Sequence, residues 1–166
     1  MNGRKYFSLL ARYHRWAYGR LYERVEELDD TRYFADQGLF FGSVHRSMNH
    51  MLLVDRLWQR RLAGEKTGRV DLAEELESGR QALRDAVFAQ ADAFIAFVDD
   101  LDEAKLDEDL AYVSSKGEPH VMPLAPLIAH IVNHGTHHRG QVSTALTQLG
   151  VAAPVMDIPY FLADPR

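Results

Sequence analysis

The sequence has 166 residues, of which 46% are hydrophobic and 26% are charged, so it can bury one sizeable core as a single domain over residues 1–166. Its 19 Lys and Arg against 24 Asp and Glu give a formal net charge of −5, which disfavours a nucleic-acid partner because phosphate binding depends on excess positive charge. The absence of cysteine excludes disulfides, thiolate zinc sites and cysteine nucleophiles, so any metal must have nitrogen or oxygen ligands.

Two stretches in the first part of the chain have helical periodicity. A first helix is predicted from about residue 3 to 28, where apolar residues recur at three- and four-residue steps: Phe7, Leu10, Ala17, Leu21, Val25 and Leu28. A second helix is predicted from Gly38 to Ala63, with Gly64 as its C-cap. One broad side of this second helix carries Phe40, Ser47, Met51, Val54, Leu57, Trp58 and Arg61.

A third helix is predicted to begin near Asp71, which is a favourable N-cap residue, and to continue to Val98. Its apolar residues are Leu72, Leu76, Leu83, Val87, Ala91, Phe94 and Val98. The helix leads into an acidic run over residues 99–109, which lacks the spacing of an EF-hand. We therefore interpret this run as solvated surface and assign it no chemistry.

The last third of the sequence predicts one non-helical excursion and one long helix. Residues 110–121 place Ser-Lys-Gly-Glu-Pro between two short apolar pieces, which indicates a small hairpin or an irregular loop. The long helix is expected to start at Pro123 or Pro126 and to end at Leu149. The tail over residues 151–166 is expected to be a nonhelical strap. The predicted fold class is an all-α four-helix bundle with a short hairpin or loop before the last helix.

Eight histidines are present, and a cluster of them lies on the last predicted helix. At about 100° per residue, His138 falls inside the apolar stripe of that helix. His134 falls at the edge of the stripe together with Gln141. His130 and His137 lie further round, toward solvent.

The second predicted helix carries two more histidines on different sides. His50 lies on or beside the apolar face, whereas His45 falls on the opposite side and is interpreted as a surface or subunit-contact residue. Two histidines four residues apart on one helix can direct their rings to a common point, and a histidine from a facing helix would complete three ligands. The pattern therefore indicates a candidate metal site made of His50, His134 and His138.

A simpler interpretation competes with the metal site. A single histidine on an apolar face is more often a core residue whose ring nitrogens bond a carbonyl group. Three buried imidazoles together would leave several donors and acceptors unsatisfied, whereas a divalent ion satisfies one nitrogen on each. The spacing alone leaves both interpretations open. Zinc-protease chemistry is disfavoured, because the segment HGTHH lacks the glutamate of an HExxH motif.

The histidine-rich segment NHGTHHRGQVSTALTQLG, from Asn133 to Gly150, closely resembles the C-terminal HxxHHRGQ motif of the DinB/YfiT-like proteins. The segment GSVHRSMNHMLLVDRLWQRRL resembles the second-helix motif of that family, with His50 followed by Asp55 and Trp58. The segments YHRWA, YVSSKGEPHVMPL and VMDIPYFL are also similar to family members. The resemblance covers nearly the whole chain.

This resemblance implies a four-helix bundle with an up-down-down-up course, a long crossover, frequent homodimerisation and a divalent metal. The implied metal ligands are His50, His134 and His138, the same three residues that the helical angles select. His14 stands where many relatives carry asparagine, so it is expected to be a fourth ligand or a residue that lines the pocket. Three neutral imidazoles with an open position suit Zn²⁺, Ni²⁺, Co²⁺ or Fe²⁺, and we predict zinc or nickel.

Three protein ligands and an open position are typical of a catalytic metal. The first functional hypothesis is a metal-dependent thiol transferase, in which a low-molecular-weight thiol binds as the thiolate and attacks a small electrophilic substrate. Some members of the wider family work in this way with bacillithiol or mycothiol. In this hypothesis Gln141 orients a ligand or the thiol. Arg139 is a candidate for binding an anionic group of the substrate, although an exposed arginine in a salt bridge is the commoner case.

Two further hypotheses remain open. The metal could instead serve hydrolysis of a small ester or amide, but the sequence identifies no catalytic acid or base. Asp55 is predicted to point away from the pocket and to cap a contact between helices or subunits. Alternatively, the protein could be a non-catalytic, stress-related metal-binding homodimer. Its interface would use the aromatic residues of the first helix, which are Tyr6, Phe7, Tyr13, Trp16, Tyr18 and Tyr22.

The sequence also sets expectations for location and partners. The first residues, MNGRKYFSLLARYHRW, are interrupted by charges before an apolar run could reach the length of a signal peptide. No run of about 20 apolar residues is present to span a membrane. We therefore expect a cytoplasmic protein without a membrane partner, which acts on a small-molecule substrate or thiol.

Overall fold

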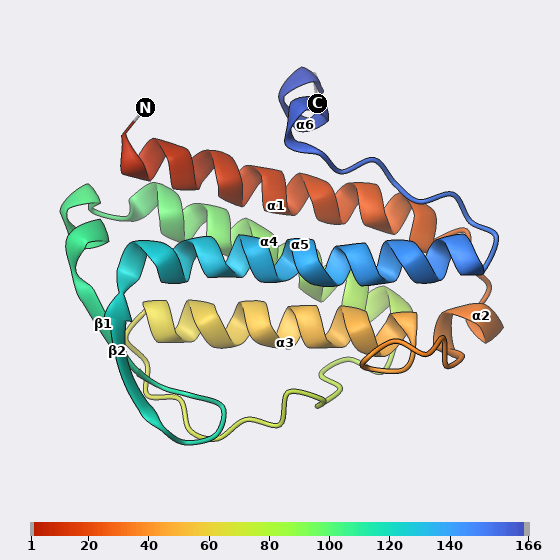
Figure 1. Cartoon of the computed structure of the whole chain (residues 1–166), viewed down its shortest axis with the longest axis horizontal. Helices are drawn as coiled ribbons and strands as arrows, with labels where there is room; N and C mark the ends of the chain where they lie inside the picture. Colours follow the sequence, from red (N-terminus) through yellow and green to blue (C-terminus); the bar gives the residue numbers. More distant parts are fainter. Residues whose placement is uncertain (1, 165–166) are drawn as a thin grey trace.

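The computed structural model describes residues 2–164 and places four long helices side by side (Figure 1). They are α1 (Gly3–Val25), α3 (Val44–Leu62), α4 (Arg80–Asp100) and α5 (Leu124–Gln148). Both α1 and α3 pack against α4 and α5. In Figure 1, α1 and α5 run in one direction, and α3 and α4 run in the other. No helix in this part of the chain is long and apolar enough to cross a membrane.

The chain is mostly helical but not all-α, because a small sheet precedes α5. Strands β1 (Asp109–Val113) and β2 (Pro119–Pro123) pair antiparallel over their whole length. The turn between them contains Gly117, whose φ of 89° favours glycine. A hydrogen bond from the Val70 amide to the Ser115 carbonyl, 3.1 Å long, fastens this hairpin to the segment before α4. The hairpin or loop predicted for residues 110–121 is therefore a hairpin.

The first predicted helix is confirmed but ends three residues early, and a short helix that was not predicted follows it. Helix α1 ends at Val25, and a turn leads to the short helix α2 (Asp30–Phe34). The Asp29 side chain accepts a hydrogen bond from the Arg32 amide and so caps α2. No helix was predicted between residues 28 and 38, so α2 was missed.

Helix α3 begins six residues later than predicted. Gly38 and Gly42 have φ values of 66° and 82°, which lie in the left-handed region and are incompatible with a continuing helix. The segment between them folds back through a hydrogen bond from the Gly42 amide to the Leu39 carbonyl. The Ser43 side chain then accepts from the Arg46 amide and caps α3. The loop before α3 therefore projects two phenylalanines, Phe40 and Phe41.

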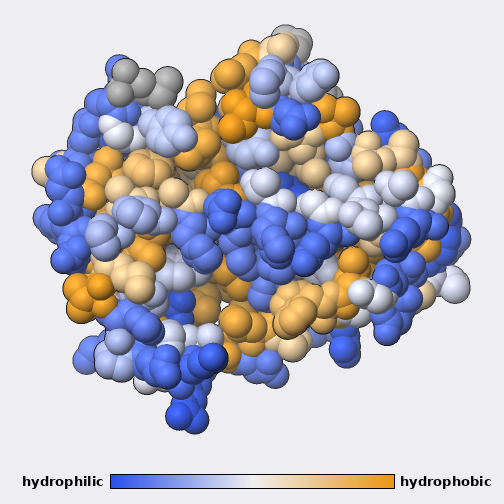
Figure 2. Space-filling model, viewed as in Figure 1, coloured by the Kyte–Doolittle hydropathy of each residue, from blue (hydrophilic) through white to orange (hydrophobic). Residues whose placement is uncertain are grey.

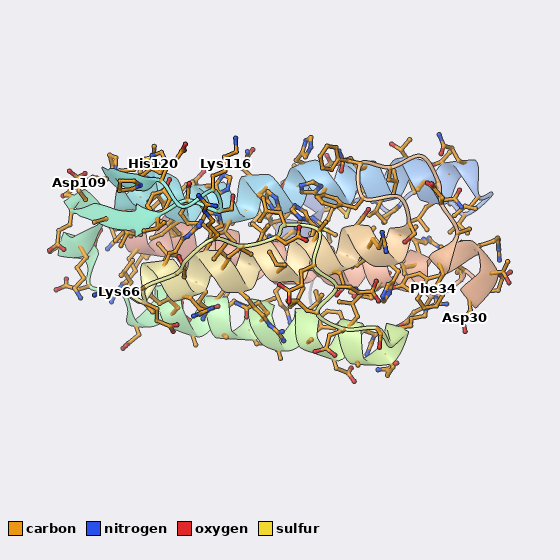
Figure 3. All side chains as sticks on the ribbon, turned by 90° about the horizontal axis from the view of Figure 1, so that it is seen from below. Asp30, Phe34, Lys66, Asp109, Lys116 and His120 are labelled. Carbon is orange, nitrogen blue, oxygen red and sulfur yellow. The ribbon has the colours of Figure 1, made fainter. Side chains whose placement is uncertain are left out.

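Helix α4 begins at Arg80 rather than near Asp71. Residues 63–79 form a crossover that returns along the bundle, and in Figure 3 the segment after Lys66 passes in front of α3. Two hydrogen bonds between Asn49 and the Glu77 backbone, of 2.9 and 3.0 Å, hold the crossover to α3. Two leucines of the crossover, Leu72 and Leu76, still pack against the core. They continue the apolar period of α4 toward the N-terminus, and this explains why the helix was predicted to begin near Asp71.

The acidic run serves caps and surface ion pairs. Its middle part forms the 3-10 helix η1 (Glu103–Asp107). The Glu103 carboxylate accepts from the Gly3 amide at 3.0 Å, at the start of α1. Asp99 pairs with Arg12 at 2.8 Å. These contacts give Glu103 and Asp99 structural roles and assign them no chemistry.

The last long helix agrees with the prediction, but the tail does not. Helix α5 follows Pro123 and ends just before Gly150, which has a φ of 80°. The tail contains the short helix α6 (Ile158–Ala163), so the expectation of a nonhelical strap is wrong. Phe161 of α6 packs against aromatic side chains of α1. Figure 2 shows apolar side chains gathered over α6 and hydrophilic ones along α5. The exposed apolar residues of α6 are Ile158, Tyr160 and Leu162.

The aromatic residues of α1 pack inward rather than forming an exposed interface. Four of the six named for a dimer surface are buried in the core, namely Phe7, Tyr13, Tyr18 and Tyr22. Trp16 packs against Phe161 with ring centroids 5.6 Å apart and the ring planes tilted. Most side chains of the interface predicted on this face are therefore covered in the folded chain by α4, α5 and α6, whereas Tyr6 stays exposed.

A buried polar network joins three of the four long helices. His14 Nε2 of α1 lies 3.0 Å from Asp55 Oδ2 of α3, and the Tyr18 hydroxyl donates to the same oxygen at 2.8 Å. Arg139 Nη1 of α5 lies 3.1 Å from His14 Nδ1, and its Nη2 donates to Thr136. Because arginine only donates, His14 Nδ1 must accept and Nε2 must carry the proton. Burial lowers the pKa of His14 and supports this neutral form.

Gly135 lets α5 approach this network closely. A Cβ atom at this position would lie 2.4 Å from His14 Cε1 and 2.7 Å from Arg139 Nη1. Both neighbours are buried and held by hydrogen bonds, so neither can move aside freely. Glycine is therefore required here by space and not by backbone conformation.

The Gly135→Ala variant should be less stable than the wild type by about 1–2 kcal/mol. The clash in a packed core costs about 1–3 kcal/mol, which exceeds the gain of about 0.5–1 kcal/mol for replacing a helical glycine. Gly140→Ala is the matched control on the same helix, since its Cβ meets nothing within 4 Å. Urea unfolding should show Gly140→Ala to be neutral or stabilised. Equal stability changes in the two variants would contradict the steric role of Gly135.

Candidate metal centre

Three histidines from two facing helices meet at one point. His50 comes from α3, and His134 and His138 come from successive turns of α5. One ligand nitrogen from each lies within 4.8 Å of the other two. Within residues 2–164, no other group of three or more His, Cys, Asp or Glu side chains meets this condition. We call these three residues the histidine trio.

Hydrogen bonds fix the ring orientation of two members of the histidine trio. His50 Nδ1 lies 2.8 Å from the Leu72 carbonyl oxygen, and His138 Nδ1 lies 2.8 Å from Gln141 Oε1. A carbonyl oxygen only accepts, so each Nδ1 must carry the proton and each Nε2 keeps its lone pair. Partners of this kind orient histidine ligands and set their tautomer in metal sites. Gln141 is thus placed to orient His138.

The third histidine completes a geometry that suits a cation. His134 Nε2 lies 3.1 Å from His50 Nε2, and His134 Nδ1 is buried without a hydrogen-bond partner among the described residues. Two nitrogens bound to one zinc ion at about 2.0–2.1 Å lie about 2.9–3.3 Å apart for bond angles between 90° and tetrahedral. The donors are neutral imidazoles, which zinc and nickel accept well. The residues therefore fit a divalent metal.

The electrostatics of the trio favour neutral rings. Burial is the main cause of the shifts, and it lowers the pKa of His134 to about 2 and that of His138 to about 4. Burial also lowers the pKa of His50. The other histidines add to the shift of His134, since neighbouring positive charges would repel. At neutral pH each of the three rings is therefore uncharged and keeps one nitrogen with a lone pair, which is the form that binds metal.

One side of the trio opens into a cavity of about 660 Å³. Phe41 stacks on the His50 ring with centroids 3.8 Å apart and shields it from solvent. Phe40 stands beside it with 84% of its surface exposed. The remaining walls come from α3, the crossover, the hairpin and α5, and they include Val54, Leu57, Trp58, Arg61, Leu72, Tyr112, His130 and His137. Helices and loops distant in sequence therefore build one pocket around the trio.

His45 is buried, contrary to the sequence-based expectation of a surface or subunit contact. Only 2% of its surface is exposed. Its ring packs against Tyr33 and Phe34 of α2, and its Nε2 lies 3.1 Å from Asn49 Nδ2. The helical angle placed His45 correctly away from the core face of α3. The missed helix α2 covers that opposite side, and this explains the error.

His14 and Arg139 belong to the buried network rather than to the cavity. Both ring nitrogens of His14 have protein partners, which leaves neither to act as the fourth ligand that the sequence suggested. Neither residue is among those that line the cavity. Arg139 was expected to be exposed or to contact substrate, but only 1% of its surface is accessible. Asp55 lies between α3 and α1, as a contact between helices.

Several residues of the site could not be found from the sequence. His130 was placed toward solvent, yet it is half-buried against Trp58 and lines the cavity. Arg61 was named only as a member of the broad apolar side of its helix. A charged residue on an apolar face was the one sequence feature that could have indicated its place in the site. The Leu72 carbonyl carries no signal at all, because every residue has one.

The fold and the site define the class of the protein, which is a helical protein with a candidate three-histidine metal site. The model of the DinB family matches residues 1–165, and the chain belongs to this family. It is 26% identical to Protein DinB of Bacillus subtilis (strain 168) over 159 residues, which cover 92% of this chain and 91% of that protein. It is also similar in fold to a DinB-like protein from Bacillus cereus ATCC 10987, with a TM-score of 0.62 and 18% identity. That match covers 84% of this chain and 89% of the other.

Replacing any member of the histidine trio by alanine should cut metal content sharply. Each variant removes one of three ligands and leaves two, which is too few for a tightly held ion. His137→Ala is the matched control, because His137 is the exposed neighbour of His138 on the same helix. Elemental analysis of protein purified without a tag or added metal measures the effect. Equal losses in all four variants would show that the trio is not the ligand set.

The metal-free protein should lose stability as the pH falls below about 6.5. The folded-state pKa values of the trio lie below the unfolded value, so the unfolded chain binds protons first. The loss should therefore begin near pH 6.5 and continue to about pH 4 for His138 and beyond for His134.

Urea unfolding between pH 7.5 and 5 covers a window above the titration of ordinary carboxyl groups. In a His134→Gln variant the unfolding free energy should depend less steeply on pH, and the slope should fall by about 1 kcal/mol per pH unit at most. An unfolding free energy that is independent of pH in this window would contradict the neutral, buried trio.

Proposed function

We propose that this DinB-family protein is a divalent-metal-dependent thiol S-transferase that acts on a small electrophilic substrate, with zinc or nickel as the metal. The observation that carries the proposal is the convergence of three neutral imidazoles beside an open cavity. A structural zinc site normally has four protein ligands, whereas a three-ligand site leaves a position for a reactant. The described residues supply no fourth ligand at this point.

A divalent metal at the trio would bind a thiol as the thiolate and so supply a strong nucleophile at neutral pH. The protein's own residues would prepare the site. The Leu72 carbonyl and Gln141 hold His50 and His138 with their Nε2 atoms directed inward. Phe41 covers the His50 ring and limits the access of water. This arrangement keeps the ligand set ordered before the reactants enter.

The cavity can hold two small molecules or one extended one. Its volume of about 660 Å³ lies within the range of about 300–1,000 Å³ typical of small-molecule sites. Val54, Leu57 and Trp58 give it an apolar wall along α3. An apolar wall suits the hydrophobic part of an electrophile and keeps bulk water away from the nucleophile.

Hydrolysis of a small ester or amide is the second candidate function. His130 favours it, because this imidazole lines the same cavity and can accept a proton from water. Among the described residues, the only carboxylate that lines the cavity is Asp71, and its Oδ1 already accepts from the Ala73 amide. The lack of a well-placed carboxylate base makes hydrolysis the weaker candidate.

A non-catalytic metal-binding homodimer is the third candidate that the sequence raised. Most aromatic residues of α1 cannot contribute to its interface, since four of the six are buried in the core of the chain itself. Homodimerisation stays a prediction from the family resemblance and would need another surface.

The transferase proposal is tested with zinc- or nickel-loaded protein, a thiol and a fluorogenic electrophile such as monobromobimane. Glutathione, bacillithiol and mycothiol are each offered at pH 7. The matching thiol should react about tenfold faster or more than without protein, since only a few per cent of a free thiol is thiolate at this pH. Chelation of the metal or His134→Ala should abolish the gain.

Binding to cobalt-loaded protein separates the candidates. A thiol that binds the metal gives a thiolate-to-cobalt absorption band, and its absence for all three thiols would remove the transferase proposal. Thiol-independent hydrolysis of p-nitrophenyl acetate that requires the metal would favour the second candidate instead. A metal-loaded protein with neither activity would favour the third.

A further inference from the structure

Arg61 places a buried positive charge at one end of the cavity. The residue lies in the last turn of α3 and only 4% of its surface is exposed. Its guanidinium packs against two neighbouring aromatic rings, with its carbon 4.8 Å from the centroid of Trp58 and 5.1 Å from that of Tyr112. All three residues line the cavity that contains the histidine trio.

No negative group of the protein neutralises this charge. Arg61 Nε donates to the Thr67 hydroxyl at 3.2 Å, and Nη2 donates to the Val113 carbonyl at 2.7 Å. Within residues 2–164, Nη1 has no hydrogen-bond acceptor, and no carboxylate oxygen lies within 4.0 Å of the guanidinium nitrogens. Burial of an unpaired charge is costly, and arginine does not lose its proton to avoid that cost.

The other arginines show how unusual this position is. Arg139 is also buried, but His14 links it to the carboxylate of Asp55. Many partly or fully exposed arginines pair directly with carboxylates, as in Arg12 with Asp99, Arg60 with Glu65 and Arg84 with Glu26. Arg61 combines deep burial, a missing counter-charge and a position on a cavity wall. These are the features of a site that an anionic ligand completes.

We propose that Arg61 binds a carboxylate of the thiol or the substrate, so that the cavity accepts an elongated anionic molecule. The identity of the group at the other end rests on the proposed thiol transferase. The anion site itself rests on Arg61 and not on the metal. Nη1 offers two N–H donors that the protein leaves unused, and a carboxylate has the lone pairs to accept them.

The two ends of the cavity are well separated. His50 and Arg61 lie on the same helix, about 16 Å apart along its axis at 1.5 Å per residue. His130 lies between the two ends, with ring centroids 5.1 Å from Trp58 and 5.7 Å from His134. The wall between them is largely apolar or aromatic. A ligand that reaches both ends therefore needs an extended, mostly uncharged middle part.

Arg61 also fastens the hairpin to α3 through Val113, and this structural role must be separated from ligand binding. Arg61→Met removes the charge and keeps much of the apolar stem. Arg61→Lys keeps the charge but loses the planar fork. Arg60→Met is the control, since Arg60 is exposed, pairs with Glu65 and does not line the cavity.

The test uses full-length protein as purified, with its metal content recorded, and two pairs of probes. Binding of 3-phenylpropionate is compared with that of its uncharged amide by calorimetry or NMR titration. The wild type should prefer the carboxylate by about tenfold or more. The preference should disappear in Arg61→Met, remain in part in Arg61→Lys and be unchanged in Arg60→Met. If Arg61→Met fails to fold, the other proteins still decide the result.

The second pair tests whether one molecule reaches both ends. On cobalt-loaded protein, 6-mercaptohexanoate should bind more tightly than 6-mercaptohexanol, and Arg61→Met should remove the difference while Arg61→Lys keeps part of it. Equal affinity for carboxylate and amide in the wild type would overturn the anion site, as would a carboxylate preference that Arg61→Met leaves intact. A carboxylate preference that depends on Arg61, without any thiolate band, would retain the anion site and refute only the thiol transferase.

Discussion

The position of the helices depends on the buried contact between His14, Asp55 and Arg139. A buried carboxylate and a buried guanidinium each cost free energy unless they are paired, and the neutral imidazole between them donates to Asp55 Oδ2 and accepts from Arg139 Nη1. Each group comes from a different helix, so the contact forms only in one register of α1, α3 and α5. His134 and His138 each precede a residue of this interface on α5. The register that pairs the buried charges therefore also directs these two histidines toward α3.

Much of this arrangement could be predicted from the sequence, because hydrophobic period and histidine spacing are local properties. The limits of α5 and the helix faces of the histidine trio follow from such patterns, and the turn residues of segment 114–119 predicted a hairpin or loop. A helical angle does not reveal which neighbour covers the opposite side of a helix. His45 and Arg139 were therefore misplaced, since α2 and α1 bury them. Helix was also predicted over two segments that are loops in the structure, namely the turn between Gly38 and Gly42 and the long crossover. The reason is that apolar residues in loops can continue a helical period by chance.

The distribution of charge differs between the surface and the interior. The chain has a formal net charge of −5, and exposed arginines such as Arg60 form ion pairs with neighbouring carboxylates. Inside the cavity the histidine trio is neutral, and no carboxylate, including the lining Asp71, lies within 4.0 Å of the Arg61 guanidinium nitrogens in the described part of the chain. An acidic exterior does not attract an anion over a long distance. Discrimination in favour of an anionic guest would then arise after entry, where low solvent access strengthens the interaction.

The hydrogen bond from His50 to the Leu72 carbonyl makes the crossover part of the metal centre. The acceptor belongs to the main chain, so many side chains at position 72 could present the same oxygen. An insertion or deletion in the crossover would instead shift that oxygen along α3 and release the imidazole. The residue types in this segment can therefore vary, whereas its length is restricted. Homologous chains should differ there by substitutions rather than by insertions or deletions.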